Sequence, residues 1–580
     1  MMRGFAAGGI RALALGLLMA CSPLRADISG TVVDDVSGAP LAAALVSIRA
    51  RPDIAPMFTL GDGSFVLPMS EPDIFEVAAA LAYDPQAPIN YLTEAQQAFD
   101  GMSGIELRLQ RLPVNDNPDY EPPAAGDFCI ACHFSYYQQW SGSRHAGAAQ
   151  NPWVLDLFSG TGTPGGSAGY VFRDTHDADD SGFCATCHAP LEDVFQPGQV
   201  MLDEVSTPAG ADGVTCLACH QIAHVNADVD ALHHLGNSEY RFPLAAAQTS
   251  FHVFGPLPDL DTVPMQNVWQ PQFEDSRICA GCHEYDNPFT GAPGQNTYTE
   301  WLASPYAQPG PGLRTCQNCH MPQQQGDAFI GTGGPLRPGS QRHSHGFVGA
   351  TPQTLAANID LRIEVEQQGA QVVLRAEVEN QCGHHFPTGI SIRNALLVLD
   401  VRWNGEALGQ IAGPTIPFWG SDDVPGEQPG DFAGWPGKGF ARVLEGRING
   451  QGPVVRPVLF IDAEGVHSDT TIPSGAIDFS EYRFALPAQA MEGDVVEVDA
   501  RLLYRRAWRA LAVTKGWTET PGGMPVEIEV QAIRSDLVLG GIAPELPPAV
   551  AVPVGNRWVL LFGLGLVTVV GAWRGMRRLH

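Results

Sequence analysis

Five copies of one short motif, C-x-x-C-H, constrain most strongly what this chain can fold into. They take up ten of the twelve cysteines and lie within the 192 residues from Cys129 to His320. A zinc site needs four clustered ligands and a disulfide needs no histidine, so neither explains a histidine after every cysteine pair. The motif is that of c-type haem attachment, in which two thiols bind the porphyrin and the histidine ligates iron. The residues concerned are Cys129, Cys132, His133, Cys184, Cys187, His188, Cys216, Cys219, His220, Cys279, Cys282, His283, Cys316, Cys319 and His320.

The close spacing of the motifs limits the architecture. Roughly 38 residues per motif cannot build a separate core around each cofactor, so five covalently bound haems are expected to form the core themselves. Glycine- and proline-rich stretches between the motifs indicate loops. The sequence therefore predicts a multidomain fold class, with an α-rich, loop-rich multihaem core at 120–350, two flanking β-sandwich domains and a C-terminal transmembrane helix.

Period-two alternation of apolar and polar residues predicts the two flanking domains. It runs through 27–112 and 355–535, with a glycine- and proline-rich insert at about 413–475. The first of these, with GTVVD, GAPL and GDGSF, resembles carboxypeptidase regulatory-like domains, which implies a binding or spacer module. The second is expected to cap the haem stack, and 536–556 is expected to be a linker.

Apolar runs mark both ends of the chain. Residues 1–26 resemble an export signal, with cleavage after Ala26 favoured over a lipoprotein-type site at Cys21. The uncharged run Trp558–Trp573 would cover about 24 Å as a helix, and arginines follow it. This predicts a single membrane span at 557–575 and an exported protein on the periplasmic side of the membrane or at the cell surface. A loose similarity to C-terminal sorting signals leaves removal of the tail open.

Twelve of the 17 histidines lie outside the motifs and are candidates for the sixth iron ligand. His145 lies five residues after Trp140, so on a helix the imidazole and the indole would lie on nearby faces. His224 follows its own motif too closely to bind the same iron, but it can serve another haem. Alternatives remain open within three pairs, and His176 in an acidic loop is undecided. From the residues alone the candidates are His145, His224, His233 and His252, with the open pairs His233/His234, His343/His345 and His384/His385.

A partial internal repeat is visible around two of the motifs. WSGSRHA, which begins at Trp140, matches WLASPYA, which begins at Trp301. Tyr306 stands where the first copy has His145. Tyrosine can ligate haem iron, but a packing aromatic with a bonded hydroxyl is the favoured interpretation of Tyr306.

The motifs and their surroundings together resemble the multihaem c-type cytochromes grouped with the tetrahaem cytochrome of ammonia oxidisers. The wider superfamily includes hydroxylamine oxidoreductase and octahaem tetrathionate reductase. The stretches CIACH, WSGSRHA, TYTEWLASPYA, CQNCHMP, HSHGF and VENQCGHHFPTG carry this resemblance over about residues 128–505. It implies that His145, His345 and His384 are distal ligands. No C-x-x-C-K motif occurs, which argues against an enzyme of the nitrite reductase type. Cys382, beside the last stretch, is expected to be a buried thiol.

These features predict an electron carrier more strongly than an enzyme. Electrons would hop between bis-histidine haems, from a membrane quinol or cytochrome pool to a redox partner such as a quinol-oxidising complex or another cytochrome. The alternative is a multihaem oxidoreductase that acts on a small nitrogen or sulfur compound at one open haem. The net charge of −30 argues against nucleic acid. It favours basic or neutral protein partners, and a solvated acidic surface explains it equally well.

Overall fold

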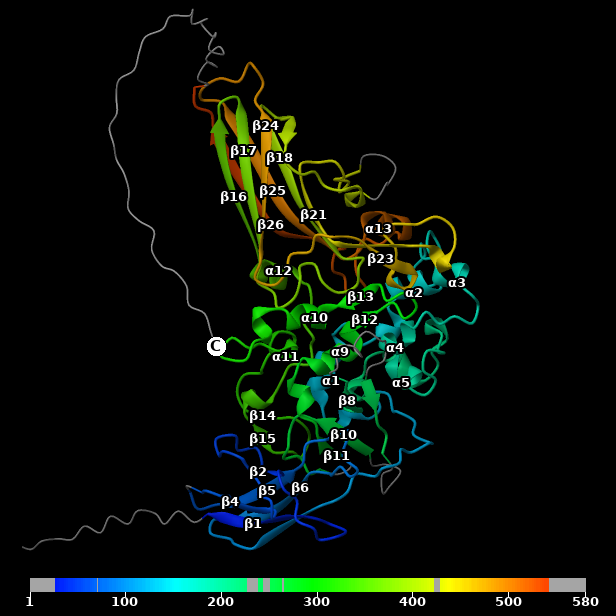
Figure 1. Cartoon of the computed structure of the whole chain (residues 1–580), viewed down its shortest axis with the longest axis vertical. Helices are drawn as coiled ribbons and strands as arrows, with labels where there is room; N and C mark the ends of the chain where they lie inside the picture. Colours follow the sequence, from blue (N-terminus) through cyan, green and yellow to red (C-terminus); the bar gives the residue numbers. More distant parts are fainter. Residues whose placement is uncertain are drawn as a thin grey trace, which may run out of the picture.

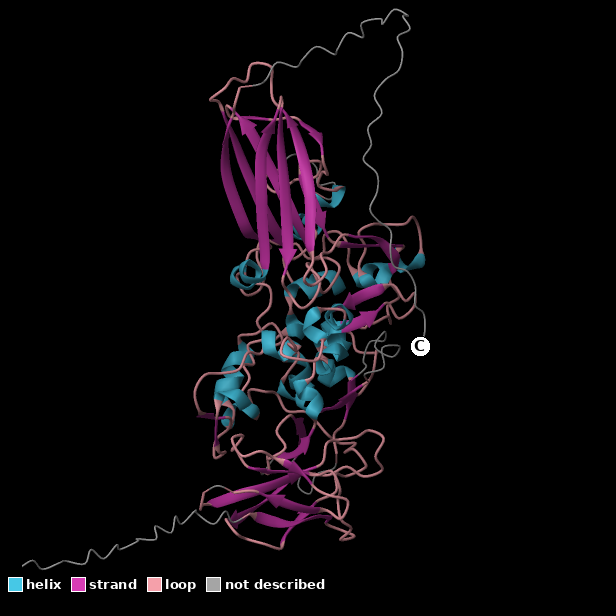
Figure 2. Ribbon diagram, turned by 60° about the vertical axis from the view of Figure 1, so that its left-hand side comes forward, coloured by secondary structure: helices cyan, strands magenta, loops and turns pink. Residues whose placement is uncertain are grey.

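The computed structural model describes residues 27–69, 71–226, 238–243, 251–262, 265–421 and 428–541. The chain is elongated, with its parts stacked in sequence order along the long axis. The N-terminal strands lie at one end, the region of the C-x-x-C-H motifs lies in the middle, and long strands form the other end (Figure 1, Figure 2).

Two small sheets form the N-terminal part. Their alternating apolar side chains, among them Val32, Phe65, Val77 and Leu107, are buried in one cluster between the sheets. The pattern of alternation has therefore produced a sandwich, as strands with one apolar face require. One sheet has the order β4 (Ser64–Leu67), β1 (Ile28–Asp34), β7 (Ile105–Leu109), and the other has the order β3 (Met57–Phe58), β2 (Leu45–Ile48), β5 (Ile74–Ala80), β6 (Glu94–Phe99).

The middle part consists of short helices, loops and two-stranded ladders. Among the described residues here no helix exceeds the eight residues of α1. The helices are α1 (Phe134–Ser141), α2 (Pro152–Phe158), α3 (Phe172–Thr175), α4 (Cys184–His188), α5 (Pro190–Asp193), α6 (Pro208–Ala211), α7 (Cys216–His220), α9 (Arg277–His283), α10 (Thr297–Leu302) and α11 (Cys316–His320). The ladders are β8 (Ile222–Val225) with β9 (Ser238–Tyr240), β10 (Phe251–Gly255) with β11 (Met265–Trp269), β12 (Glu284–Asp286) with β13 (Pro293–Asn296), and β14 (Ala328–Phe329) with β15 (Leu336–Arg337). Single 3-10 turns occur at η1 (Cys129–Ala131), η2 (Ala148–Gln150), η3 (Leu202–Glu204), η4 (Pro271–Glu274), η5 (Pro305–Ala307) and η6 (Gly339–Gln341).

A second, larger sandwich forms the C-terminal part. Its two sheets enclose one apolar cluster that includes Leu374, Leu397, Tyr482 and Leu502. One sheet is β16 (Ile359–Gln368), β17 (Gln371–Asn380), β24 (Ile477–Ala485), β20 (Gln410–Ala412), and the other is β19 (Glu406–Ala407), β18 (Asn394–Trp403), β25 (Val495–Arg505), β26 (Glu527–Val538), with β21 (Gly437–Phe440) also paired to β18. The remaining elements are the hairpin β22 (Arg442–Gly446) with β23 (Ala463–Asp469), the helices α12 (Pro352–Asn358) and α13 (Arg509–Lys515), and the turns η7 (Phe418–Gly420), η8 (Ile448–Gly450) and η9 (Phe460–Asp462).

The predicted fold class, with its α-rich core, is wrong. The described residues are only 20% helix but 33% strand. Each motif supports little more than one helical turn, and the alternating segments form strands of up to twelve residues. Among the described residues, no helix combines the length and the apolar character that crossing a membrane requires. The predicted signal at 1–26 and span at 557–575 lie outside the described residues, and the predicted domain boundaries remain predictions.

Lys515 joins the C-terminal sandwich to the middle part. Its ammonium group is buried and donates hydrogen bonds to the backbone carbonyls of Asp156, Gly166 and Tyr170. The buried Asp156 carboxylate in turn accepts from the Trp517 indole at 2.7 Å. Trp517 also stacks on Trp153, with ring centroids 4.5 Å apart. Burial lowers the pKa of Lys515, and the three carbonyls together with Asp156 compensate the buried charge.

Replacing Lys515 with methionine is expected to destabilise the protein by about 3 kcal/mol, because three buried carbonyls and one carboxylate would lose their cation. Urea unfolding of the purified protein measures the change. Val513→Ala on the same helix is the control, since Val513 is 45% exposed and its truncation should change stability by less than about 0.5 kcal/mol. Equal stability of the Lys515→Met variant and the wild type would contradict the assigned role.

Candidate haem-attachment sites

Helical backbone places the three reactive side chains of each motif together. Four of the motifs lie on α4, α7, α9 and α11, and the first begins in η1. On a helix the first cysteine, the second cysteine three residues on and the histidine four residues on share one face. Thr215 caps α7 by accepting from the Ala218 amide, and Thr315 forms a capping box at α11. These caps fix where the turn begins, and so which face the three side chains share.

All five motif histidines are held through Nδ1. Four donate a hydrogen bond to a backbone carbonyl: His133 to Ile330 (2.7 Å), His188 to Ala148 (3.1 Å), His220 to Phe254 (2.8 Å) and His320 to Val348 (2.6 Å). The Nδ1 of His283 instead lies 2.8 Å from the side-chain amide of Gln295. Where the partner is a carbonyl, the bond fixes the tautomer and the ring orientation and leaves Nε2 free to bind a metal. His283 reaches the same tautomer when Gln295 presents its amide oxygen, rather than the nitrogen, to Nδ1.

Two histidines from elsewhere in the chain face motif histidines at the distance expected of two imidazoles that bind one iron. The ring centroids of His145 and His283 are 6.3 Å apart, and those of His384 and His320 are 6.4 Å apart. Two imidazoles on opposite sides of one iron, each bonded at about 2 Å, would have their centroids about 6 Å apart. Burial lowers the pKa of His145 and His384 to about 4 and that of His283 to about 3. The neutral form, which binds metals, is therefore present at neutral pH.

The loop that carries His384 is held by Glu300 on α10. One Glu300 oxygen accepts hydrogen bonds from the Thr388 hydroxyl at 2.5 Å and the His385 amide at 3.2 Å. The other accepts from Arg442 at 3.1 Å. The stretches TYTEWLASPYA and GHHFPTG, which are far apart in the sequence, thus form one polar cluster beside the motif of α11.

The other predicted ligands differ in their placement. His345 packs against Tyr136 at 4.8 Å, and the charges of His220 and His133 help burial to lower its pKa to about 4, so it lies near both motif histidines. His224 on β8 is opposite Glu239, and the buried His252 on β10 lies 3.4 Å from the Pro243 carbonyl. In the described part of the chain we find no ring contact between either of them and a motif histidine. His233 and His234 lie outside the described residues.

The undecided histidines have partners of their own. His176 contacts Asp462 through Nε2 at 3.0 Å and stacks on Phe172, so both of its sides are engaged. His343 donates from Nδ1 to the Met321 carbonyl, and His385 lies 3.0 Å from the Thr471 hydroxyl. Among the described residues neither His343 nor His385 has a ring contact with a motif histidine, whereas His384 faces His320.

The pKa shifts of the thiols show which motifs adjoin. The neighbouring Cys216 thiol is the largest cause that raises the pKa of Cys129, as Cys282 is for Cys187 and Cys316 for Cys279, so the first motif lies beside the third, the second beside the fourth and the fourth beside the fifth. Burial is the largest cause that raises the pKa of Cys219 to about 12, and the charge of Cys282 is the second largest. The third motif therefore also adjoins the fourth. None of the described cysteines is in a disulfide. The fourth motif therefore adjoins three others.

The partial repeat has a structural purpose that the sequence did not reveal. The Trp140 indole donates to the Val214 carbonyl and the Trp301 indole donates to the Arg314 carbonyl, both at 2.8 Å. Each carbonyl precedes the first cysteine of a motif by two residues. Tyr306 occupies the place of His145, and its hydroxyl donates to the Gln381 carbonyl. Each tryptophan thus stabilises the backbone two residues before a motif begins.

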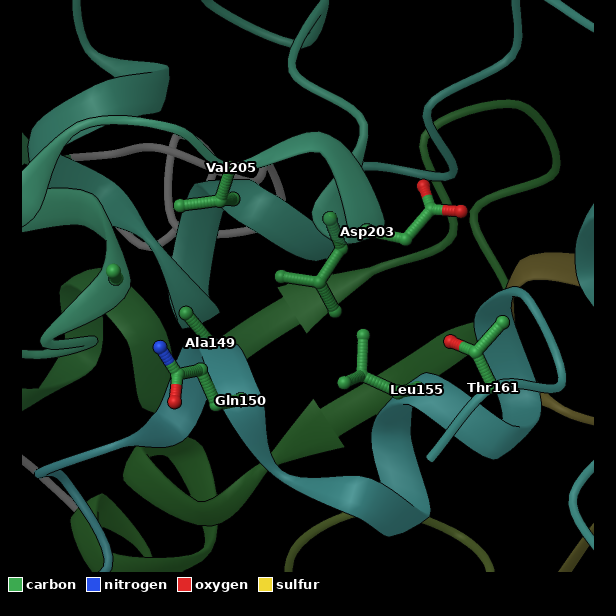
Figure 3. A pocket seen from close by; sticks show the side chains of 8 residues that line it. Ala149, Gln150, Leu155, Thr161, Asp203 and Val205 are labelled. Atoms are coloured by element: carbon green, nitrogen blue, oxygen red, sulfur yellow. The ribbon is translucent and has the colours of Figure 1, made fainter. Parts of the chain in front are cut away.

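One cavity in the described part of the chain lies beside the second motif. Its volume is about 150 Å³, and it adjoins η2, whose Ala148 carbonyl accepts the His188 hydrogen bond (Figure 3). Asp203 is its one ionisable side chain and pairs with Arg173 at 2.8 Å. The cavity therefore presents no nucleophile or acid–base pair. Its lining is Ala149, Gln150, Leu155, Thr161, Leu202, Asp203, Val205 and Ala211.

The side chains present fit c-type haem. Every motif supplies two reduced thiols and an imidazole with a fixed Nδ1, and two more buried imidazoles stand at the distance expected of a second axial ligand. No group of three or more His, Cys, Asp or Glu among the described residues forms a cluster that would hold a bare metal ion. This donor set suits a planar cofactor with axial ligands better than zinc.

One solved structure is similar to this chain over most of its length. It is the crystal structure of a penta-heme cytochrome c552 from Thermochromatium tepidum, at 21% sequence identity and a TM-score of 0.45, covering 71% of this chain and 98% of that one. No protein-family model matches the chain, and no curated protein matches it. A likeness this loose transfers no residue roles, so each role assigned to a residue of this protein rests on the contacts that the residue makes.

Gln295 is a site residue that sequence analysis missed, because glutamine has no motif signal of its own. Replacing it with leucine removes the partner of His283 Nδ1 and should raise the reduction potential of one haem, since a less basic imidazole stabilises ferric iron less. Gln295→Glu should lower the same potential. Spectroelectrochemical titration measures the reduction potentials of both variants. Equal shifts of the potential in the two variants would contradict a role of Gln295 through His283 Nδ1.

Proposed function

We propose that this protein is a pentahaem c-type cytochrome that carries electrons. The observation that carries the proposal is that all five motifs adjoin in one connected set, from the first through the third to the fourth, with the second and fifth both beside the fourth. Bound haem supplies iron that takes up and releases one electron. The chain holds neighbouring sites close together, which short-range transfer requires.

In this proposal the ligands are assigned from the ring contacts. The motif histidines His133, His188, His220, His283 and His320 are the proximal ligands. His145 completes the site of His283, and His384 completes the site of His320. His345 serves the first or the third motif, since it lies near both of their histidines.

Electrons would enter and leave at the exposed ends of the connected set, which are two of its three ends. Cys132 of the first motif and Cys319 of the fifth are exposed, whereas the other motif cysteines are partly or fully buried. We infer that redox partner proteins dock near these two ends. Export is part of the proposal, because haem is attached covalently outside the cytoplasm.

A second function is favoured by one observation. His188 is half-buried, and no other histidine ring contacts it among the described residues. If no side chain completes this site, the second motif could bind a small nitrogen or sulfur compound, and the protein would be an oxidoreductase.

The haem content and the iron spin state distinguish these functions. We expect five haems per chain by pyridine haemochrome absorbance and mass spectrometry, and only low-spin signals in the EPR spectrum of the oxidised protein. Fewer haems would contradict the assignment of the five motifs. A high-spin signal from one haem that changes on addition of nitrite, hydroxylamine or sulfite would establish the second function instead.

Substitution of single histidines tests the distal ligands. His145→Ala should convert one haem from low-spin to high-spin, because the site of His283 would lose its second imidazole. His176→Ala is the matched control, since that ring is bonded to Asp462 and should leave every haem low-spin. A low-spin spectrum of the His145→Ala variant with full haem content would remove His145 from the ligand set.

A further inference from the structure

Three arginines from separate parts of the chain meet beside the fourth and fifth motifs. Arg393 directly precedes β18 and Arg506 directly follows β25, and the antiparallel pair Asn394–Arg505 makes them neighbours at the end of this ladder. Arg144 precedes His145 in the chain. The Ala350 carbonyl accepts from Arg506 Nη2 at 2.7 Å, and Phe347, three residues earlier, packs against His145 at 4.3 Å. The segment 347–350 therefore connects the two sides of the cluster.

None of the three has an anionic partner among the described residues. Arg393 and Arg506 donate only to backbone carbonyls, and Arg144 makes no hydrogen bond or ion pair there. Most other arginines of this acidic chain are paired, as Arg442 is with Glu300 and Asp469. Burial, then the charges of Arg144 and Arg393, lowers the pKa of Arg506 to about 10, with no carboxylate opposing them. Three cations held together without a carboxylate are unfavourable unless an anion joins them.

The cluster is adjacent to the histidines of two haem sites. Arg393 donates to the Thr388 carbonyl at 3.3 Å, in the loop that carries His384, and His145, the residue after Arg144, faces His283 with ring centroids 6.3 Å apart. His145 supplies an independent observation, because its Nδ1 is buried and has no hydrogen-bond partner. The other three imidazoles of the two facing pairs each have a partner on Nδ1. This buried Nδ1 therefore still needs a hydrogen-bond partner.

We propose that Arg144, Arg393 and Arg506 form an oxyanion site that binds a carboxylate or a similar small oxyanion next to His283 and His384. The anion has two possible sources with the same chemistry, a propionate of a haem held at these motifs or a free oxyanion from solution. Guanidinium groups suit both, because their paired N–H donors match the two oxygens of a carboxylate or phosphate. The inference rests on the proposed function, since without haem the first source is absent.

Arg144→Gln is the cleanest test, because Arg144 has no bond whose loss could unfold the chain. The variant should lower the reduction potential of one haem, since removal of a nearby positive charge stabilises the ferric form. Arg144→Lys keeps the charge and should preserve the potential. Arg402→Gln is the matched control, because Arg402 is paired with Asp400 near the other end of β18.

Inorganic phosphate, added at constant ionic strength, distinguishes the two sources. If the anion is a propionate, the potentials of the wild type do not respond to phosphate, and Arg144→Gln and Arg393→Gln still lower one of them. If it is a free oxyanion, phosphate lowers one potential of the wild type to saturation, and Arg144→Gln weakens that response about tenfold. The proposal is overturned if both glutamine variants have wild-type potentials and phosphate has no effect. Haem content is measured on every sample, so a missing haem is recognised separately as a failure of the proposed function.

Discussion

The hydrogen bond on Nδ1 of each motif histidine is the interaction on which the rest of the structure depends. A motif of five residues can hold two thiols and an imidazole on one helical face, but it cannot orient the imidazole alone. The acceptor comes from another part of the chain: Ile330 lies 197 residues from His133, and Ala148 lies 40 residues from His188. Each site is therefore complete only when distant loops have packed, so the folding of the middle part and the assembly of its sites are one process.

The same dependence explains why the two sandwiches flank the middle part rather than standing apart from it. The loop with His384 leaves the C-terminal sandwich and donates hydrogen bonds to the Glu300 carboxylate on α10. Lys515 and Trp517 anchor the same sandwich to α2 and its following loop. At the opposite end, the Tyr83 and Thr93 amides of the N-terminal part donate to carbonyls of β11. Rigid sheets at both ends can thus hold loops that have little regular structure of their own.

Much of the candidate site could be predicted from the sequence because its chemistry is local. The fifteen motif residues follow from spacing alone, and the resemblance carried by the pattern W-x-x-S-x-H-A pointed to His145, whose role as a ligand stays a prediction. The prediction of an α-rich core was wrong because each helix ends at its histidine, where loops and short ladders take over. His224 was predicted to serve a haem other than that of its own motif, and His252 was predicted because aromatic residues flank it; the structure pairs His224 with Glu239 across a ladder and places His252 beside the Pro243 carbonyl, and both ligand roles stay predictions. Gln295 and the three arginines carry no sequence signal. Their roles depend on the side chains that the fold places next to them, which are distant in the sequence.

The sequence by itself determined the number of thiol–histidine motifs, the alternation that produces two sandwiches and the acidity of the chain. These properties depend on residue type and on spacing over a few positions, which the backbone converts directly into a shared face. Only the tertiary structure decided which imidazole faces which, which motifs adjoin and where uncompensated positive charge collects. Those relations join residues tens to hundreds of positions apart, and the packing of loops between two sheets, rather than any local preference, brings them together.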